Sequence, residues 1–314
     1  MRVVFASVFL LVMGCAPVRA LEPRLPAEFE RPVIDDAIRQ HAGGTYAKLS
    51  AGVTRYELAG PEAGPRVVLI HGASGPMDVW DRTVAALAGA GYRVLRYDLF
   101  GRGFSDRPRA RYDEAFYQTQ LAELLERVGW NGPLRVVGSS MGAIIGARFV
   151  AEHADRVRAV CLIGPAGFPI HATPISKLMP VPLIGDAAMR LLGDRMLTAH
   201  NRAYYFQPER FPEAHAKFHE QLLYRGYRDA VLSTMRHMPM NDFSDGYRAL
   251  GRTAVPRLLL WGREDHTFPH SNLPYARELL GGCPAVTIEQ AGHVPQYEQP
   301  EQLQAALLPF LASQ

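Results

Sequence analysis

The chain has 314 residues, which is enough for one large domain or two ordinary ones. Hydrophobic residues make up 48% and charged residues 21%, a globular composition that excludes disorder, collagen or a coiled coil for the whole chain. The net charge of +3 argues against nucleic acid or a membrane surface as an electrostatic partner.

Residues 1–20 have the pattern of a leader segment. Arg2 is followed by an apolar run over 3–13, which is shorter than the roughly 20 residues needed to span a bilayer. We expect a secretory signal peptide cleaved after Ala20, and hence a periplasmic or secreted protein with a net charge of +1. The alternatives are a lipoprotein leader cleaved before Cys15, which would anchor the protein in the outer membrane or at the cell surface, and a misassigned start codon.

Beyond the leader, apolar runs of strand length alternate with helical patterns. The runs are nearly continuous in Val, Leu and Ile, which is typical of strands covered on both faces. They lie at 53–58, 66–70, 93–97, 134–137, 157–163, 257–261 and 285–288. Apolar residues at helical spacing over 80–87, 141–149 and 303–310 predict helices. This alternation predicts an α/β protein with a mostly parallel sheet flanked by helices.

Residues 168–252 interrupt the alternation. They lack strand signals, and 183–197 and 215–235 have helical patterns. We interpret the segment as a helical cap inserted into a core of 21–167 and 253–314, because it is much longer than a single crossover requires. The alternative is a few ordinary crossover helices.

The cap is expected to supply an adaptable apolar lining for a substrate, although about half of the residues concerned serve only to hold the cap together. These residues are Met179, Met189, Met196, Met235, Met238, Met240, Tyr204, Tyr205 and Phe206.

The segment 138–142 reads GSSMG between a predicted strand and a predicted helix. It matches G-x-S-x-G, the sharp turn that exposes a nucleophilic serine. Gly138 and Gly142 remove side chains that would collide with the adjoining strand and helix, which holds Ser140 at the tip of the turn. Ser139 is a rival in another register, but no glycine lies two residues before it.

A serine hydroxyl is a weak nucleophile, so it needs a base that a third group holds in one tautomer. Two later strands end in suitable residues: Asp265, with Glu264 beside it, and His293 in a Gly-His turn. We expect His293 to take the proton from Ser140 and later return it to the leaving group, while Asp265 orients the imidazole. His266 is interpreted as a loop residue.

The oxyanion of an acyl-transfer intermediate needs backbone donors. We expect the N–H groups of Met141 and of Ala73, which follows His71 and Gly72 after another strand, and the loss of one such donor typically costs about 100- to 1000-fold in rate. His71 is interpreted as a structural brace of this turn. Ser74 is a further candidate donor through its hydroxyl.

From about residue 45 to 312 the chain resembles the serine hydrolases of the α/β-hydrolase fold. The motifs LIHGASG, RYDLFGRGFSDRP, VVGSSMG, LLLWGREDHTFP and AGHVPQYEQP occur in the family's order. The resemblance implies a Ser140, Asp265, His293 triad, and the W-G-x-x-D spacing selects Asp265 over Glu264. Asp98 and 101–103 fall in the family's post-strand loop, where we interpret them as structural.

The serine at the elbow argues against the dehalogenase and epoxide-hydrolase branches, which begin from a carboxylate. HGASGPMD lacks the longer glycine-rich turn of C–C bond hydrolases, and Met141 stands where proline iminopeptidases carry tryptophan. The expected function is therefore hydrolysis of a carboxylic ester with a small or medium apolar acyl group. The alternatives are a C–C hydrolase, a cofactor-free perhydrolase or haloperoxidase, and a non-catalytic binding protein on the same fold.

No cofactor or metal is expected, because the chain has no C-x-x-C or H-E-x-x-H pattern. Cys161 lies in an apolar run and reads as a core residue, and a disulfide with Cys283 is left open. The expected partner is a small-molecule ester, with membrane attachment only through a lipidated Cys15.

Overall fold

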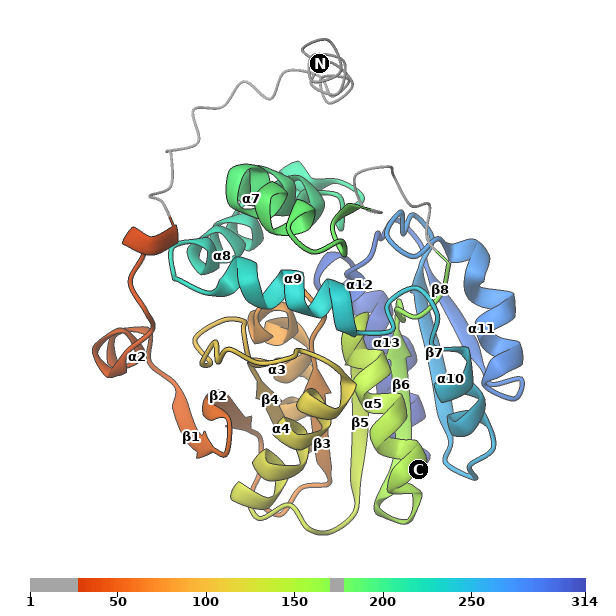
Figure 1. The fold of residues 1–314 in the computed structure, drawn as a ribbon. Coiled ribbons are helices and arrows are strands. Elements are labelled where there is room, and N and C mark those ends of the chain that lie inside the picture. The colour runs from red at the N-terminus through yellow and green to blue at the C-terminus, as the bar shows by residue number, and fades with distance from the viewer. Residues whose placement is uncertain (1–27, 170–177) are drawn as a thin grey trace.

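The computed structural model describes residues 28–169 and 178–314, and it contains one eight-stranded sheet of order β1-β2-β4-β3-β5-β6-β7-β8 (Figure 1). The strands are β1 Thr45–Leu49, β2 Gly52–Ala59, β3 Arg66–Ile70, β4 Arg93–Tyr97, β5 Leu134–Ser139, β6 Val157–Ile163, β7 Arg257–Gly262 and β8 Ala285–Ile288. β1 and β2 pair antiparallel at one edge, and β3 to β8 are parallel. The predicted mostly parallel sheet is confirmed.

The seven predicted strands are present, and their ends agree with the prediction to within two residues. β1 was missed because its sequence, TYAKL, has no apolar run. Its side chains alternate between exposed and buried, as expected for an edge strand with one face toward solvent.

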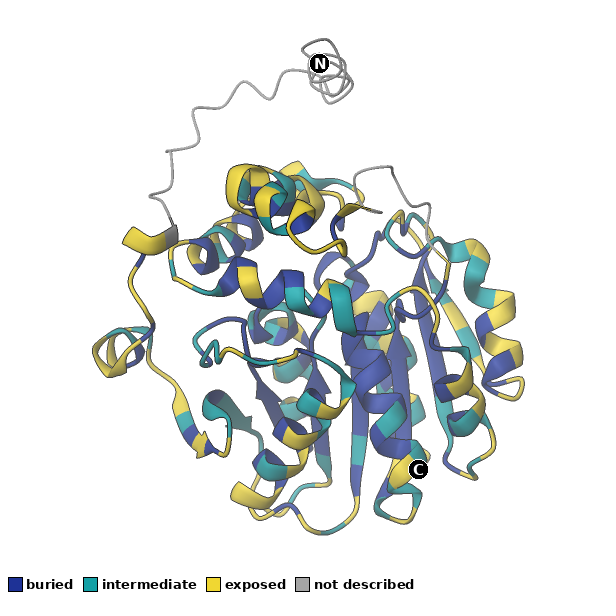
Figure 2. Ribbon diagram, viewed as in Figure 1, coloured by how far each residue is buried: buried dark blue, intermediate teal, exposed yellow. Residues whose placement is uncertain are grey.

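Helices cover both faces of the sheet. α4 Glu114–Arg127, α5 Met141–Glu152, α10 Ser244–Gly251 and α11 Leu273–Leu279 contribute to the core on one face. α3 Asp81–Gly89 and α13 Pro300–Ala312 enclose the other. Figure 2 shows the central strands buried between these layers. Double coverage explains the continuous apolar runs in the strands.

The remaining elements, apart from three longer helices between β6 and β7, are short. They are η1 Glu28–Glu30, α2 Asp36–Ala42, η2 Met77–Trp80, η3 Ala154–Arg156, η4 Pro208–Arg210, η5 His270–Asn272 and α12 Pro295–Glu298.

Three helices between β6 and β7 lie over one end of the strands (Figure 1): α7 Ile184–Arg202, α8 Pro212–Leu222 and α9 Tyr227–His237. We call them the helical segment. The single helix predicted over 215–235 is wrong: the chain turns at Gly226, whose φ of 88° is a left-handed conformation that favours glycine, and the helix is split in two. α10, which the sequence analysis placed with the cap, packs against α5 beside the sheet.

The helical segment has a hydrophobic core of its own, separate from the cores of the sheet. Met179, Met189, Leu197, Phe218, Leu222, Tyr227, Val231 and Leu232 form this cluster. A further apolar cluster joins the segment to the chain after β8, in which Tyr204, Tyr205, Phe211 and Ala214 pack with Val294 and Tyr297. Polar contacts, described below, add to this interface.

The predicted leader, including Cys15, lies outside the described residues. Cys161 and Cys283 are both buried and both free thiols, so the structure contains no disulfide between them. Within 28–169 and 178–314, no helix has the length and apolar character needed to cross a bilayer.

Candidate active site

Ser140 lies in a strained turn between β5 and α5. Its φ of 55° and ψ of −120° are an unusual conformation for a residue with a side chain. The flanking glycines permit it: a Cβ on Gly138 would lie 2.3 Å from the carbonyl oxygen of Gly142, and one on Gly142 would lie 2.1 Å from that of Ile70. Close packing of strand and helix thus fixes Ser140 at the tip of the turn.

The structure brings Ser140, His293 and Asp265 together in a hydrogen-bonded series. The Oγ of Ser140 lies 2.8 Å from Nε2 of His293, and Nδ1 of His293 lies 2.8 Å from Oδ2 of Asp265. The three residues are at most 4% exposed. With Nδ1–H donating to the carboxylate, Nε2 is free to accept the hydroxyl proton of the serine.

Asp265 is held in place by the loop that follows β7. Its Oδ1 accepts hydrogen bonds from the N–H groups of Thr267 at 2.8 Å and Phe268 at 2.9 Å, which leaves Oδ2 for His293. Glu264, the neighbouring acid, instead accepts from the N–H of Ala291 at 3.0 Å. Of the two carboxylates, only Asp265 contacts His293.

His293 follows β8 and is held by contacts from two directions. Its N–H donates to the carbonyl of Tyr204 at 2.6 Å, and its ring packs between those of Tyr204 and Phe268. The preceding Gly292 donates its N–H to Glu298, whose other oxygen accepts from the N–H of Phe206. The loop that carries the imidazole is therefore bonded to the chain that leaves α7.

Burial raises the pKa of Glu298 to about 7, while the N–H groups that it accepts oppose this shift. A carboxyl group that titrates near neutral pH thus lies five residues beyond the imidazole.

The expected oxyanion donors lie beside Ser140. Met141 is the first residue of α5, and Gly72 packs so closely that a Cβ there would lie 3.1 Å from that of Ser140. Neither the N–H of Ala73 nor that of Met141 donates to any residue that the structure describes. A developing oxyanion requires two such N–H groups, free to donate, next to the nucleophile.

The turn that carries Ala73 is held by side chains from outside it. The Nε of Arg102 donates to the carbonyl of Ala73 at 2.6 Å. The carbonyl of Ser74 accepts from the hydroxyl of Tyr227 at 2.8 Å and from Nε2 of Gln221 at 3.1 Å. Since Gln221 is in α8 and Tyr227 in α9, the helical segment fixes the position of this turn.

His71 contacts backbone groups on both ring nitrogens. Nδ1 donates to the carbonyl of Gly72 at 2.8 Å, and Nε2 accepts from the N–H of Leu99 at 2.9 Å. Burial lowers its pKa to about 3, so the ring stays neutral. Asp98 accepts in the same way from the N–H groups of Met77 and Phe104. Both residues brace loops and neither contacts Ser140.

A narrow cavity of about 50 Å³ lies in front of Ser140. The helical segment, including the loop between α7 and α8, contributes part of its wall: Asn201, Tyr204, Tyr205, Ala214, Lys217 and Phe218. The expected lining is thus found for the two tyrosines, but none of the six methionines nor Phe206 lines this cavity. Three of the methionines are instead buried in hydrophobic cores: Met179 and Met189 in that of the helical segment, and Met238 in that of the sheet. Met235 is 38% exposed.

Gln296 and Tyr297 also line the cavity, and the sequence analysis missed both. Nε2 of Gln296 donates to the hydroxyl oxygen of Ser139 at 3.1 Å, so the rival serine is bonded away from the imidazole. Their position three and four residues after His293, in the same motif, was the available signal. Among the described residues, no three His, Cys, Asp or Glu side chains are grouped to hold a metal ion.

The chain is similar to known proteins over most of its length. Residues 67–306 match the alpha/beta hydrolase family. Lipase 1 of Psychrobacter immobilis is 26% identical over 252 residues, which cover 77% of this chain and 75% of that protein. The 2-hydroxy-6-oxo-6-(2'-aminophenyl)hexa-2,4-dienoic acid hydrolase of Metapseudomonas resinovorans is 25% identical over 268 residues, 82% of this chain and 87% of that one. The solved enol-lactonase of Burkholderia xenovorans LB400 has a TM-score of 0.74 at 22% identity, covers 85% of this chain and all of its own, and supports the fold alone.

Proposed function

The chain belongs to the alpha/beta hydrolase family, and on that premise we propose that it cleaves carboxylic esters through an acyl-enzyme on Ser140. The observation that carries the proposal is the unbroken hydrogen-bond series from Ser140 through His293 to Asp265, buried at one end of a cavity. This arrangement provides a nucleophile, its base and the group that orients the base.

In the proposed reaction, Oγ of Ser140 attacks the ester carbonyl carbon while Nε2 of His293 takes the hydroxyl proton. The carbonyl oxygen becomes an oxyanion that accepts from the N–H groups of Ala73 and Met141. The alcohol then leaves with the proton from His293. A water molecule, deprotonated by the same imidazole, attacks the acyl carbon, releases the carboxylic acid and restores the serine.

The cavity favours a small or medium acyl group. A space of about 50 Å³, walled by Tyr204 and Phe218, is much smaller than the 300 to 1,000 Å³ typical of sites for drug-sized ligands. Asn201, Lys217 and Gln296 add polar groups to the wall, which suit the oxygen atoms of an ester better than a long alkyl chain.

Two measurements test the proposal. A panel of p-nitrophenyl esters from acetate to palmitate should give its highest kcat/KM at short or medium chains. A fluorophosphonate probe should label the wild-type protein and fail to label Ser140→Ala. Absence of labelling would identify a binding protein instead, and a preference for palmitate or inactivity on all esters would contradict the proposed substrate.

A second candidate reaction is hydrolysis of a C–C bond, because a relative of similar coverage is named as a dienoic acid hydrolase. The same serine chemistry serves both reactions, so the residues do not distinguish them. Ring-cleavage dienones and peroxide-dependent halogenation should be assayed beside the esters. A kcat/KM on a dienone above that on every ester would reverse the order of the two candidates.

Export is part of the proposal, and it depends on the leader pattern of residues 1–20. The mature protein is then periplasmic or secreted, or lipid-anchored if cleavage occurs before Cys15. The intact mass of the protein recovered from soluble and membrane fractions separates these cases, since cleavage after Ala20 and acylation of Cys15 give different masses. A full-length mass in the cytoplasmic fraction would contradict export.

A further inference from the structure

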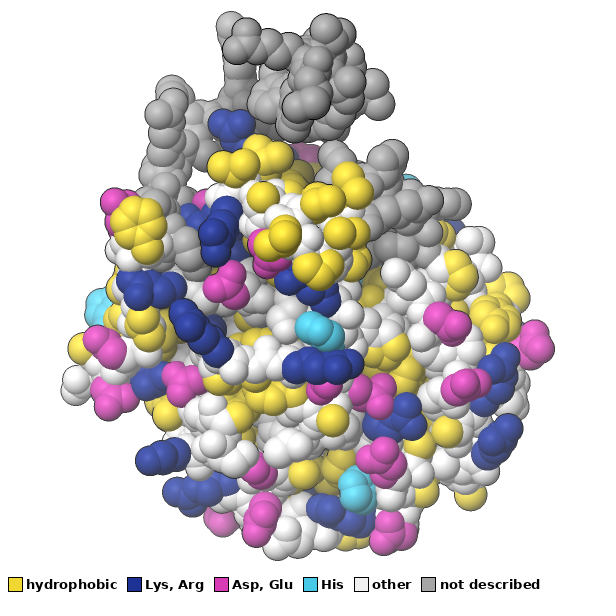
Figure 3. All heavy atoms as spheres, viewed as in Figure 1, with side chains coloured by type: hydrophobic (Ala, Val, Ile, Leu, Met, Phe, Trp, Pro, Cys, Tyr) yellow, Lys and Arg dark blue, Asp and Glu magenta, His cyan; other side chains and the backbone are white. Residues whose placement is uncertain are grey.

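The outer face of α7 carries an apolar surface that no described part of the chain covers. Leu183 is 83% exposed and Leu191 81% exposed, and Ile184 and Leu192 are exposed beside them. Ala187 and Leu191 lie four residues apart on one side of the helix, and Leu183 directly precedes the helix, so exposed apolar side chains extend from its start onto its outer face. Figure 3 shows hydrophobic side chains gathered over α7 at the top of the view. A patch of this kind usually marks an interaction site.

Packing within the helical segment does not require these leucines. The opposite face of α7 already supplies Met189 and Leu197 to the core against α8 and α9. The helix is therefore apolar on two faces, one turned toward the protein and one away from it. A helix that served only to cover the site would be polar on its outer face.

The acidic and basic side chains of α7 differ in whether they form ion pairs. Its acidic residues pair with other elements: Asp186 with Arg236 at 2.9 Å, and Asp194 with Arg31 at 2.7 Å. Its arginines are exposed, and no ion pair joins any of them to a described acid. These arginines are Arg190, Arg195 and Arg202. The two acids are thus paired, whereas Arg190 and Arg195 are exposed on the same stretch of α7 as Leu191.

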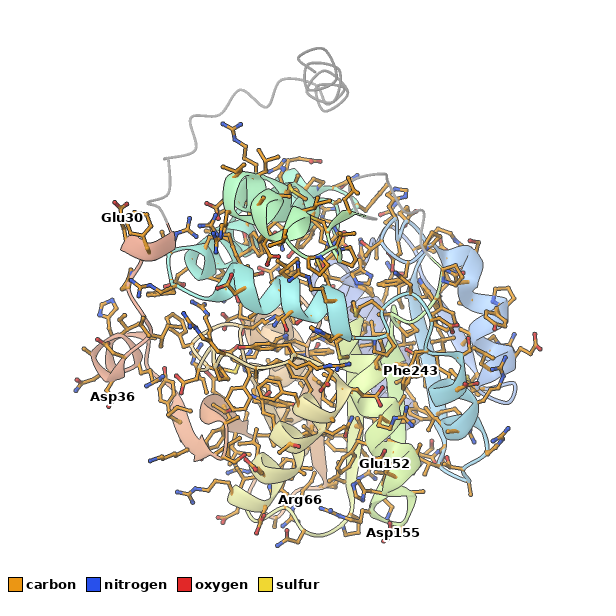
Figure 4. The ribbon with its side chains drawn as sticks, in the orientation of Figure 1. Glu30, Asp36, Arg66, Glu152, Asp155 and Phe243 are labelled. Atoms are coloured by element: carbon orange, nitrogen blue, oxygen red, sulfur yellow. The ribbon has the colours of Figure 1, made fainter. Side chains whose placement is uncertain are left out.

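The first described residues of the chain lie against the same helices. Arg31 donates to the carbonyl of Leu222 and to Asp194, and the N–H of Arg225 donates to the carbonyl of Pro32. Phe29, which is 74% exposed, lines a groove together with Leu191 and Leu192. In Figure 4 Glu30 lies beside α8. Residues 29–32 therefore lie against the helical segment.

From these observations we propose that the outer face of α7 docks the protein on an anionic lipid bilayer. Leucine and isoleucine side chains would enter the boundary between headgroups and acyl chains, while Arg190, Arg195 and Arg202 reach the lipid phosphates. The near-neutral net charge of the chain does not oppose this, because the positive charge is local to one face. The inference concerns binding alone and does not depend on the proposed ester hydrolysis.

Vesicle co-sedimentation tests the proposal, with the full chain in a Ser140→Ala background so that lipid hydrolysis plays no part. The vesicles contain phosphatidylglycerol and phosphatidylcholine in equal parts, or phosphatidylcholine alone. Leu183→Ser combined with Leu191→Ser should lower the partition coefficient on mixed vesicles about tenfold. Arg190→Gln combined with Arg195→Gln should lower it about tenfold on mixed vesicles and little on phosphatidylcholine.

Matched controls lie far from α7. Val286→Ser on β8 removes another partly exposed apolar side chain, and Arg252→Gln at the end of α10 removes another exposed guanidinium group; both should bind as the parent does. The far-UV circular dichroism spectra and melting temperatures of all these variants should match those of the parent, which shows that they fold. If the double leucine variant does not fold, Leu191→Gln alone should still weaken binding.

Three results would overturn the proposal. The first is that the parent protein shows no preference for anionic vesicles. The second is that the α7 variants bind as tightly as the controls, which would assign membrane binding to another part of the chain. The third is that the leucine substitutions convert a dimer to a monomer in sedimentation velocity without changing vesicle binding, which would make a second copy of this chain the occupant of the face.

Discussion

The two regions that meet at the cavity are built in different ways. At the end of the sheet, Ser140, Asp265 and His293 each follow a strand and are fixed by backbone contacts within a fully packed core. The helical segment has a small core of its own and an exposed apolar outer face. The comparison teaches that Ser140, Asp265 and His293 are positioned by the ends of the buried strands, whereas the wall of the cavity comes from a separate layer, joined to the sheet by apolar and polar contacts.

These two regions are nevertheless joined at specific atoms. The helical segment reaches the turn of Ala73 through Tyr227 and Gln221, and the chain after α7 reaches the loop of His293 through the carbonyl of Tyr204. Four predictions test how far the regions act separately, taken from the largest expected effect to the smallest.

The largest effect is expected within the sheet region. Asp265→Asn should lower kcat by about 10⁴-fold, because an amide facing Nδ1 favours the wrong imidazole tautomer. His293→Ala should lower it by a similar factor. The melting temperatures, measured by calorimetry, should stay nearly unchanged. Unfolding of either variant would show that the group is structural and would place the chemistry elsewhere.

The next effect is expected at Glu298, where the two regions share a carboxyl group. Its pKa of about 7 exceeds the ordinary value of 4.5, so the folded state binds more protons than the unfolded state between these values, and this contribution to stability is lost as pH rises. Glu298→Gln removes this dependence. In urea unfolding, the variant should gain up to about 3 kcal/mol relative to wild type between pH 4 and pH 8.

The control for this measurement is Glu301→Gln, which changes an exposed glutamate at the start of α13. Its stability should follow that of the wild type at every pH. Parallel curves for Glu298→Gln and wild type would mean that Glu298 keeps an ordinary pKa in the folded protein.

A smaller effect is expected where the helical segment contacts the turn that carries Ala73 and Ser74. Tyr227→Phe removes one of the two hydrogen bonds to the carbonyl of Ser74 and should lower kcat about fivefold with little change in KM, as the loss of roughly 1 kcal/mol predicts. Tyr224→Phe is the matched control, because its hydroxyl has no hydrogen-bond partner among the described residues. A rise in KM at constant kcat would make Tyr227 part of the substrate pocket instead.

The smallest effect is expected at the surface. Lys217 on α8 forms an ion pair of 2.9 Å with Asp81 on α3, and both side chains are about two-fifths exposed. Lys217→Met should lower the free energy of unfolding by less than about 1 kcal/mol, and high salt should reduce the difference. Lys48→Met, on the exposed side of β1, is the control. A larger loss would mean that this contact, more than the buried hydrogen bonds, attaches the helical segment.

The same contrast explains what the sequence could predict. Strands such as β3 and β6 were located residue by residue, because burial on both faces leaves a continuous apolar run. Ser140, Asp265 and His293 were found because each lies in a short motif at a strand end.

The helical segment gave no such signal. Asn201 and Lys217 line the cavity because of how α7 and α8 are oriented, which the sequence does not specify. The sequence alone also does not show whether a methionine of this segment lies in a core or in a pocket. The hydrogen bonds from Gln221 and Tyr227 to the carbonyl of Ser74 join residues about 150 positions apart in the sequence. No short sequence motif can predict a contact over that separation.

The bond from the N–H of His293 to the carbonyl of Tyr204 limits how freely such a protein can be re-engineered. Substrate range is often altered by grafting a different lid onto a conserved scaffold. Here a transplanted lid would have to return a carbonyl to His293 and two donors to Ser74, since each buried polar group left without its partner costs about 1–3 kcal/mol. A chimera that lacked these three hydrogen bonds would keep Ser140, Asp265 and His293, but the loop of His293 and the turn of Ser74 would lose contacts that fix their positions.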